Sequence, residues 1–174
     1  RTQIPVLNSA STPIHVQTTE AAFTKTGMYD ASGDVKKIKN DEGFIEIITV
    51  NLQGVEYKIL NNSSATGTKL NGFIQVSEDP AGPFTNIVQL TNFDPQTELG
   101  ITHLAELETD GVEVVNSALS IFSGGELTFG SQKLYYRLQG TATTPGTINT
   151  DFTMELKIFL VVLGVVEVDI PVGP

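Results

Sequence analysis

Residues 148–170 read Ile-Asn-Thr-Asp-Phe-Thr-Met-Glu-Leu-Lys-Ile-Phe-Leu-Val-Val-Leu-Gly-Val-Val-Glu-Val-Asp-Ile. At residues 152–158 apolar side chains alternate with polar ones, a period of two that is typical of a β-strand with one buried face. From Ile158 to Leu163 the apolar residues are consecutive, which indicates that both faces of the strand are covered there. We therefore expect another sheet, or another subunit, to cover the second face of this strand.

Shorter strand patterns divide most of the remaining chain, and turn residues such as Gly, Pro, Asn and Asp separate them. The clearest patterns lie at residues 44–52, 55–60, 70–77, 84–90, 112–122, 127–129 and 133–140. Residues 53–54 predict a hairpin turn between the first two. No segment sustains a helical period. About eight to ten short strands without a helix predict an all-β protein, an antiparallel β-sandwich with a jelly-roll-like arrangement.

The first 19 residues predict an extended N-terminal arm made of two short pieces, residues 3–7 and 14–18. Each piece contains or adjoins a proline, Pro5 or Pro13, and proline suits an arm or an edge strand because it cannot donate to a ladder. Residues 20–174 predict a single β-sandwich domain, which begins with a long loop at residues 20–42. A chain of 174 residues is long enough to bury its own core.

The composition excludes several classes of protein. The chain has no cysteine, so disulfides and thiolate metal sites are excluded. Its net charge is −10, and the nine acidic residues between Lys69 and Lys133 have no basic residue among them. Such a surface repels a phosphate backbone, so we expect no nucleic-acid partner. No apolar run reaches the length of about 20 residues that a membrane-spanning helix needs, so we expect no membrane insertion.

One loop pattern predicts a metal site. Asp30, Ser32 and Asp34 place three oxygen side chains at alternate positions, and calcium takes six to eight oxygen ligands from loops of this kind. The competing interpretation is an ordinary turn, which favours Asp, Ser and Gly for backbone reasons. No other cofactor is predicted.

No catalytic motif is recognisable in the sequence. His15 and His103 are the two histidines, and neither has a second His or Cys at metal-binding spacing. The pattern Gly-x-Ser-x-Gly of a nucleophile elbow does not occur. A pair of glycosidase-type carboxylates would meet only in the folded chain. We therefore expect a protein that is not an enzyme, with a glycosidase as a distant alternative.

Two segments carry a family resemblance. Residues 72–87 read Gly-Phe-Ile-Gln-Val-Ser-Glu-Asp-Pro-Ala-Gly-Pro-Phe-Thr-Asn-Ile, and residues 133–141 read Lys-Leu-Tyr-Tyr-Arg-Leu-Gln-Gly-Thr. The first resembles a hairpin, and the second the closing strands, of β-sandwich domains in structural proteins of tailed bacteriophages. The resemblance implies a virion role such as capsid decoration, head fibre or tail component, and it carries no catalytic residues.

A subunit of that kind would form a homo-oligomer and contact other virion or surface proteins. We expect the contact residues in the arm, in the last strand and beside an exposed tyrosine. They are Ile4, Val6, Leu7, Ile158, Leu160, Val162, Tyr135 and Arg137. The alternative is an exported carbohydrate- or surface-binding module, an adhesin or a pilus-type subunit, located outside the cell or on its surface, with Tyr135 or Tyr136 as glycan contacts.

Overall fold

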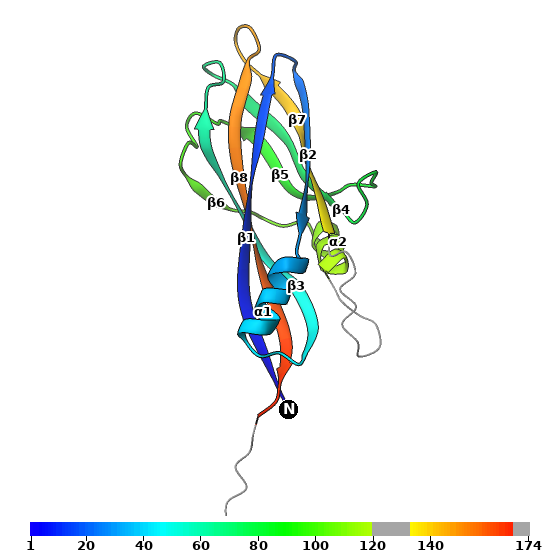
Figure 1. Ribbon diagram of the computed structural model, residues 1–174. Coiled ribbons are helices and arrows are strands. Elements are labelled where there is room, and N and C mark those ends of the chain that lie inside the picture. Colours follow the sequence, from blue (N-terminus) through cyan, green and yellow to red (C-terminus); the bar gives the residue numbers. More distant parts are fainter. Residues whose placement is uncertain (120–132, 169–174) are drawn as a thin grey trace, which may run out of the picture.

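The computed structural model describes residues 1–119 and 133–168, which form a sandwich of two antiparallel sheets (Figure 1). The strand order is β1-β8-β3-β6 in the first sheet and β2-β7-β4-β5 in the second. The strands are β1 (Thr2–Thr18), β2 (Ala22–Asp30), β3 (Glu46–Asn62), β4 (Lys69–Ser77), β5 (Thr85–Phe93), β6 (Thr102–Leu104), β7 (Lys133–Thr143) and β8 (Thr150–Val166). Within the described ranges there are two helices, α1 (Ser32–Asp41) and α2 (Thr109–Leu119).

The pairing of the strands is nested. The first strand pairs with the eighth, the second with the seventh, the third with the sixth and the fourth with the fifth, all antiparallel. Eight strands paired in this way are one long hairpin rolled into a sandwich, which is the jelly-roll arrangement. The predicted all-β sandwich is therefore confirmed.

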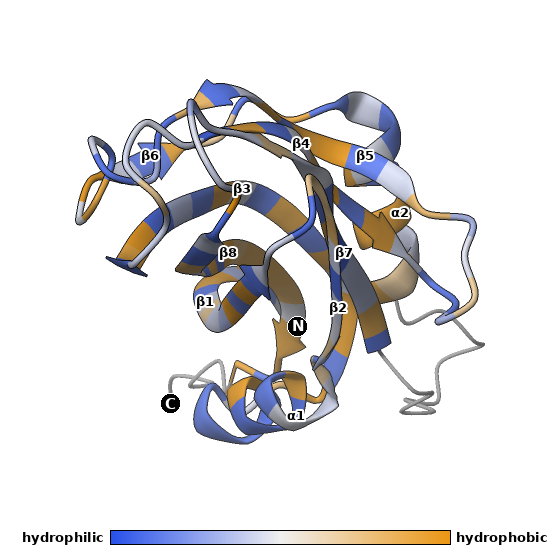
Figure 2. Ribbon diagram, turned by 90° about the horizontal axis from the view of Figure 1, so that it is seen from above, coloured by the Kyte–Doolittle hydropathy of each residue, from blue (hydrophilic) through white to orange (hydrophobic). Residues whose placement is uncertain are grey.

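The core lies between the sheets, and the last strand contributes a complete inward row. Phe152, Met154, Leu156, Leu160 and Val162 are all buried, as the period of two requires. The bands of hydrophobic and hydrophilic residues along the strands follow the same alternation (Figure 2). Because β1, β3 and β8 have 17 residues each and β2 has nine, the first sheet extends beyond the second at its lower end, where α1 lies across it (Figure 1).

Helix α1 and strand β2 occupy the segment where the sequence predicted a long loop. The inward residues of the helix, Val35 and Ile38, follow buried Ala31 at helical spacing. Three lysines surround them and dilute the apolar signal. Phe44 then folds back over Gly164 of β8, where a Cβ atom would overlap the phenyl ring. The helix thus covers the inner face of the first sheet where the second sheet ends.

Helix α2 replaces residues 112–119 of the strand that was predicted at residues 112–122, and the last three residues of that strand lie outside the described ranges. Its valines favoured a strand, yet Gly111, Val115 and Leu119 are buried at a spacing of four residues. Gly111 lets the helix backbone approach β5, because a Cβ atom there would overlap the carbonyl oxygen of Asn86. Tertiary packing therefore decides this element against local propensity. The predicted strand at 127–129 lies outside the described residues.

Two further differences concern β1 and β3. The predicted arm is one continuous edge strand that pairs with β8 from Thr2 to Thr18. The predicted hairpin turn at residues 53–54 is instead an irregularity within β3, where the register shifts between Leu52 and Gly54. Asn116 of α2 accepts a hydrogen bond of 2.7 Å from the backbone N–H of Leu52, so the helix satisfies a donor beside this β-bulge.

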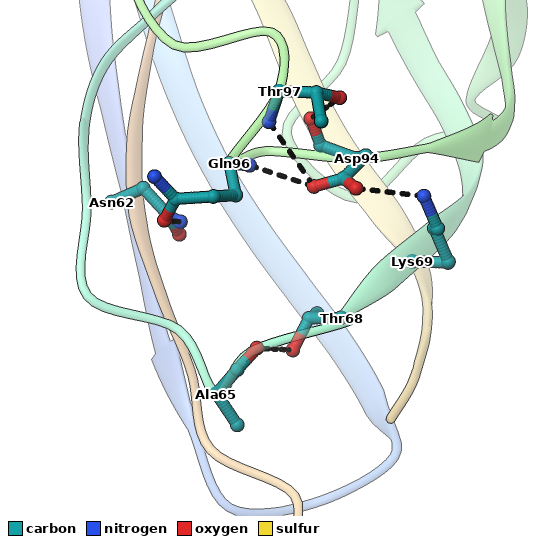
Figure 3. A network of polar contacts seen from close by, with 7 residues as sticks. All are labelled: Asn62, Ala65, Thr68, Lys69, Asp94, Gln96 and Thr97. Atoms are coloured by element: carbon teal, nitrogen blue, oxygen red, sulfur yellow. Dashed lines mark hydrogen bonds and ion pairs between the residues drawn. The ribbon is translucent and has the colours of Figure 1, made fainter. Parts of the chain in front are cut away.

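A polar network holds the loops at the upper end of the sandwich (Figure 3). Lys69, at the start of β4, donates to Asp94 at 2.7 Å, and the other carboxylate oxygen accepts from the N–H groups of Gln96 and Thr97. The Lys69 hydrogen bond, more than any other contact, lowers the pKa of the Asp94 carboxyl. This network ties the second sheet to the segment that crosses to the first. No helix of the described ranges is long and apolar enough to cross a membrane.

Candidate assembly surface

The outer face of the first sheet changes character along its length. Residues of β8 with odd numbers point outward, opposite the buried row with even numbers. In the upper half these residues are polar, and in the lower half they are Phe159, Val161 and Leu163, each half-buried. Leu7 of β1 pairs directly with Val161 and is 67% exposed. The last strand is therefore apolar on both faces in its lower half, as its sequence indicated.

Leu104 extends this apolar surface on the same outer face. It lies on β6, the edge strand opposite β1. A Cβ atom at Gly54 would lie 3.8 Å from Leu104 and 3.9 Å from Phe159, so the glycine lies between these two side chains. Leu104 is 74% exposed. We call the set of Leu7, Leu104, Phe159, Val161 and Leu163 the apolar patch. Exposed contiguous apolar surface of this kind marks a site of interaction.

Four charged residues adjoin the apolar patch and form what we call the charge square. Glu56 of β3 pairs in register with Lys157 of β8, and Lys58 pairs with Glu155 two residues further along. Opposite charges thus alternate both across and along the two strands. Within the described part of the chain none of these four groups forms an ion pair. The Lys157 ammonium instead lies 4.9 Å from the ring centroid of Phe159, next to the apolar patch.

The predicted contact residues lie in three different environments. Leu7 belongs to the apolar patch. Ile4 is 37% exposed, Val6 and Ile158 pack partly against the core, and Leu160 and Val162 are each 1% exposed. Leu160 and Val162 therefore belong to the core of one chain and cannot contact a second subunit. The sequence missed Phe159, Val161 and Leu163, the outward residues of the same strand.

Tyr135 and Arg137 lie on the outer face of the second sheet, on β7. The Arg137 guanidinium lies 4.2 Å from the ring centroid of Phe84, and its Nε donates to Gln75 at 2.7 Å. Tyr136, the neighbour with opposite orientation, makes a hydrogen bond of 3.0 Å with Thr12 of β1 across the open edge between the sheets. Tyr135 thus stays at the surface, whereas Tyr136 belongs to the interior.

The predicted calcium residues make contacts within the chain. Asp30 accepts from the backbone N–H of Ser32 at 3.0 Å and from its hydroxyl, and the hydroxyl contact is the main cause of the lowered pKa of Asp30. Asp34 accepts from the Tyr29 hydroxyl at 2.7 Å, and burial raises the pKa of that tyrosine. In residues 1–119 and 133–168 no three His, Cys, Asp or Glu side chains form a group that could hold a metal ion. Calcium binding stays a prediction.

The two histidines lie beside separate carboxylates. His15 Nε2 is 2.9 Å from Asp151 Oδ1. His103 Nε2 is 3.0 Å from Glu98 Oε2, without hydrogen-bond geometry, and the imidazole stacks on Tyr57 at 5.1 Å between ring centroids. Both histidines therefore have a local structural partner.

Comparisons with known proteins return one weak structural likeness. No protein-family model matches the chain, and no curated protein matches it. A cryo-EM structure of the semi-empty virus-like particle of giant freshwater prawn Macrobrachium rosenbergii nodavirus is similar with a TM-score of 0.35 and 10% sequence identity. The match covers 97% of this chain and 98% of that chain. A likeness of this degree assigns neither a family nor a function.

Proposed function

We propose that the protein is a non-enzymatic structural subunit of a virion, such as a capsid decoration, head fibre or tail component, and that it associates with copies of itself through the outer face of the first sheet. The observation that carries the self-association is the apolar patch next to the charge square. The virion role is supported by the jelly-roll pairing, which recurs in viral capsid domains, and by the resemblance of residues 72–87 and 133–141 to phage structural proteins. Fold alone does not determine function.

The charge square is self-complementary, which favours a second copy as the occupant. A two-fold axis parallel to the strands, between β3 and β8, brings two outer faces together. Glu56 of each copy then faces Lys157 of the other, and Lys58 faces Glu155. The same axis places the lower, apolar half of one sheet against the lower half of the other. A contact with this symmetry is closed, and each contact occurs twice.

The size of the face fits a stable dimer. Three strands of 17 residues form a surface of roughly 800 Å² from the rise per residue and the strand spacing. A standard interface buries about 800 Å² on each partner. The charges lie in the upper half, where Leu104 pairs with Glu56, and the rest of the apolar patch lies in the lower half. The charges therefore set the register of the contact, and the apolar side chains supply the free energy of burial.

The test uses absolute mass from light scattering behind a sizing column, followed by two charge variants. A chain of 18.7 kDa is expected to elute as a dimer or a multiple of it. Glu56→Lys and Lys157→Glu should each weaken self-association at least about tenfold, because each creates two like-charge contacts. Mixed together, the two variants should form a heterodimer, since positions 56 and 157 then carry opposite charges in both contacts. A monomeric wild-type chain at all accessible concentrations, or no recovery on mixing, contradicts self-association through this face.

The virion role needs a separate measurement. Particles purified from the source material should contain the protein in a fixed ratio to the main shell protein, by quantitative mass spectrometry. Absence of the protein from intact particles contradicts the virion role and leaves the dimer contact untouched.

The second candidate is the exported carbohydrate- or surface-binding module. One observation favours it, an uncharged hollow on the outer face of the second sheet. Its pilus-type variant is less well supported, because Pro5 and Pro13 lie in the edge strand β1. An edge that lacks two N–H donors is a poor template for a strand from a neighbouring subunit.

A further inference from the structure

The outer face of the second sheet contains a hollow of about 590 Å³. It runs across all four strands of that sheet. Its lining contains no Asp, Glu, Lys or Arg, although these residues make up 17% of the chain. Phe23 lines the hollow from the buried core. The other main lining groups are five amide side chains and the ring of Phe73, namely Asn71, Phe73, Gln75, Asn86, Gln89 and Gln139. We call this hollow the amide trough.

The register of the strands places the amides around the aromatic ring. Phe73 on β4 pairs with Gln139 on β7 and with Gln89 on β5. Both glutamines are exposed, and Phe73 is half-buried. Directly opposite residues in a sheet have neighbouring side chains. The ring of Phe73 is thus flanked on two sides by amide groups that face solvent.

A second row of polar groups is already ordered within the chain. Arg137 Nε donates to Gln75 Oε1 at 2.7 Å, and Gln75 Nε2 donates to Asn86 Oδ1 at 2.8 Å. This chain of hydrogen bonds fixes the orientation of both amides. Side chains held in place before binding lose less conformational entropy when a ligand arrives.

Paired glycines lie at the centre of the trough. Gly72 on β4 pairs with Gly140 on β7, and a Cβ atom at Gly72 would overlap the backbone of Gln139. The two strands approach here more closely than larger residues allow. The glycines face the interior, since a Cβ atom at Gly140 would contact buried Phe23, so they set the spacing of β4 and β7 beneath the trough.

From these observations we infer that the amide trough binds a neutral oligosaccharide. Each Asn or Gln amide both donates and accepts hydrogen bonds, as sugar hydroxyls do, and the Phe73 ring offers an apolar face to the C–H face of a pyranose. A nucleic acid or an acidic polysaccharide would need cations that the trough lacks. A lipid or another apolar ligand would cover the exposed amides of Gln89 and Gln139 without offering them hydrogen bonds.

This inference deepens the second candidate function, a carbohydrate-binding module, and does not depend on the proposed structural role. The amide trough and the charge square lie on opposite outer faces of the sandwich, on separate sheets. A variant with a disrupted self-contact, Lys157→Glu, should therefore bind oligosaccharide as the wild type does. The mass in solution thus tests self-association, and the oligosaccharide titration tests the amide trough, independently of each other.

The experiment is a titration of the isotope-labelled protein with maltohexaose, cellohexaose and chitohexaose, each at millimolar concentration, followed by amide NMR shifts. At least one of them should give saturable shifts confined to β4, β5 and β7 around Phe73. The double substitution Gln89→Ala with Gln139→Ala should weaken that binding at least about tenfold. Gln17→Ala, an exposed glutamine on β1, is the matched control and should change nothing.

Three outcomes of the titration overturn the inference. One is the absence of shifts with all three neutral oligosaccharides. Another is a set of shifts outside the trough, and the third is equal or tighter binding of a heparin hexasaccharide. Phe73→Ala provides an independent variant if the glutamine double variant does not fold, as judged from the dispersion of its amide spectrum. Unchanged affinity in folded Phe73→Ala also overturns the inference.

Discussion

The two sheets of this sandwich share one core but present different chemistry on their outer faces. The first sheet has alternating charges at its upper end and exposed apolar side chains at its lower end. The second has an uncharged trough lined by amides. Charge alternation and apolar area suit a protein surface with the same pattern, whereas neutral amides suit neutral hydroxyls. The difference suggests a division of roles, with one face for assembly and the other for an external ligand.

The largest expected effect comes from removing the apolar patch, which should abolish the assembly role of the first sheet. Leu7→Lys combined with Leu104→Lys replaces two exposed leucines (67% and 74% exposed) with cations. Self-association should weaken at least about a hundredfold, because each leucine loses its burial twice in a symmetric contact. Light scattering over a dilution series measures the change.

Met28→Lys is the matched control for that experiment. Met28 is 46% exposed and lies on β2 of the second sheet. Met28→Lys adds one positive charge where the leucine pair adds two, and on this sheet it should leave the mass in solution unaltered. If Met28→Lys disrupts the oligomer as strongly as the leucine pair, the second sheet, and not the first, forms the contact.

The sequence predicted the class of fold well because its strongest signals are local. Residues 70–77, 84–90 and 133–140 were predicted as strands from alternation and turns, and they match β4, β5 and β7 within a few residues. The prediction missed both helices, and for α2 the reason is physical. The valines of α2 favour strands locally, and only close packing on β5, which Gly111 permits, makes the helix the better solution.

The sequence predicted that the candidate assembly surface is apolar, but it did not predict which residues form it. The doubly apolar run in the last strand correctly indicated a second apolar face. The residues chosen for contact, Ile158, Leu160 and Val162, belong to the inward row. The alternation that begins at Phe152 already places residues 159, 161 and 163 on the opposite face, because a strand keeps its period of two. The charge square could not be predicted, since the register between β3 and β8 includes three irregularities.

A second prediction concerns the polar network that ties the start of β4 to the segment between β5 and β6. Asp94→Asn removes the charge that Lys69 and two backbone N–H groups stabilise. The free energy of unfolding should fall by about 1.5–3 kcal/mol, the usual range for hydrogen bonds to a charged group. The melting temperature should then fall by several degrees in a chain of this length. Calorimetry at neutral pH measures the loss.

The pH dependence of the free energy of unfolding tests the Lys69–Asp94 interaction independently. The folded state lowers the pKa of Asp94 below its ordinary value of 3.8. Its contribution is therefore fully present above that value and is lost as the pH falls through the lower, folded-state value. Between neutral and acidic pH the wild type should lose more stability than Asp94→Asn does. Parallel pH profiles of the two proteins would show that Asp94 titrates without effect on folding.

The smallest expected effect concerns Tyr136, which should contribute to stability but not to ligand binding at the surface. Tyr136→Phe removes a hydrogen bond of 3.0 Å to Thr12 across the open edge of the sandwich. This should cost about 0.5–1.5 kcal/mol, measured by urea unfolding. Because the phenol points inward, where a Cβ atom at Gly27 would overlap it, oligosaccharide binding should not change. Loss of binding in a variant that remains stably folded would mean that the two faces communicate through the core, and the division of roles between the sheets would then need revision.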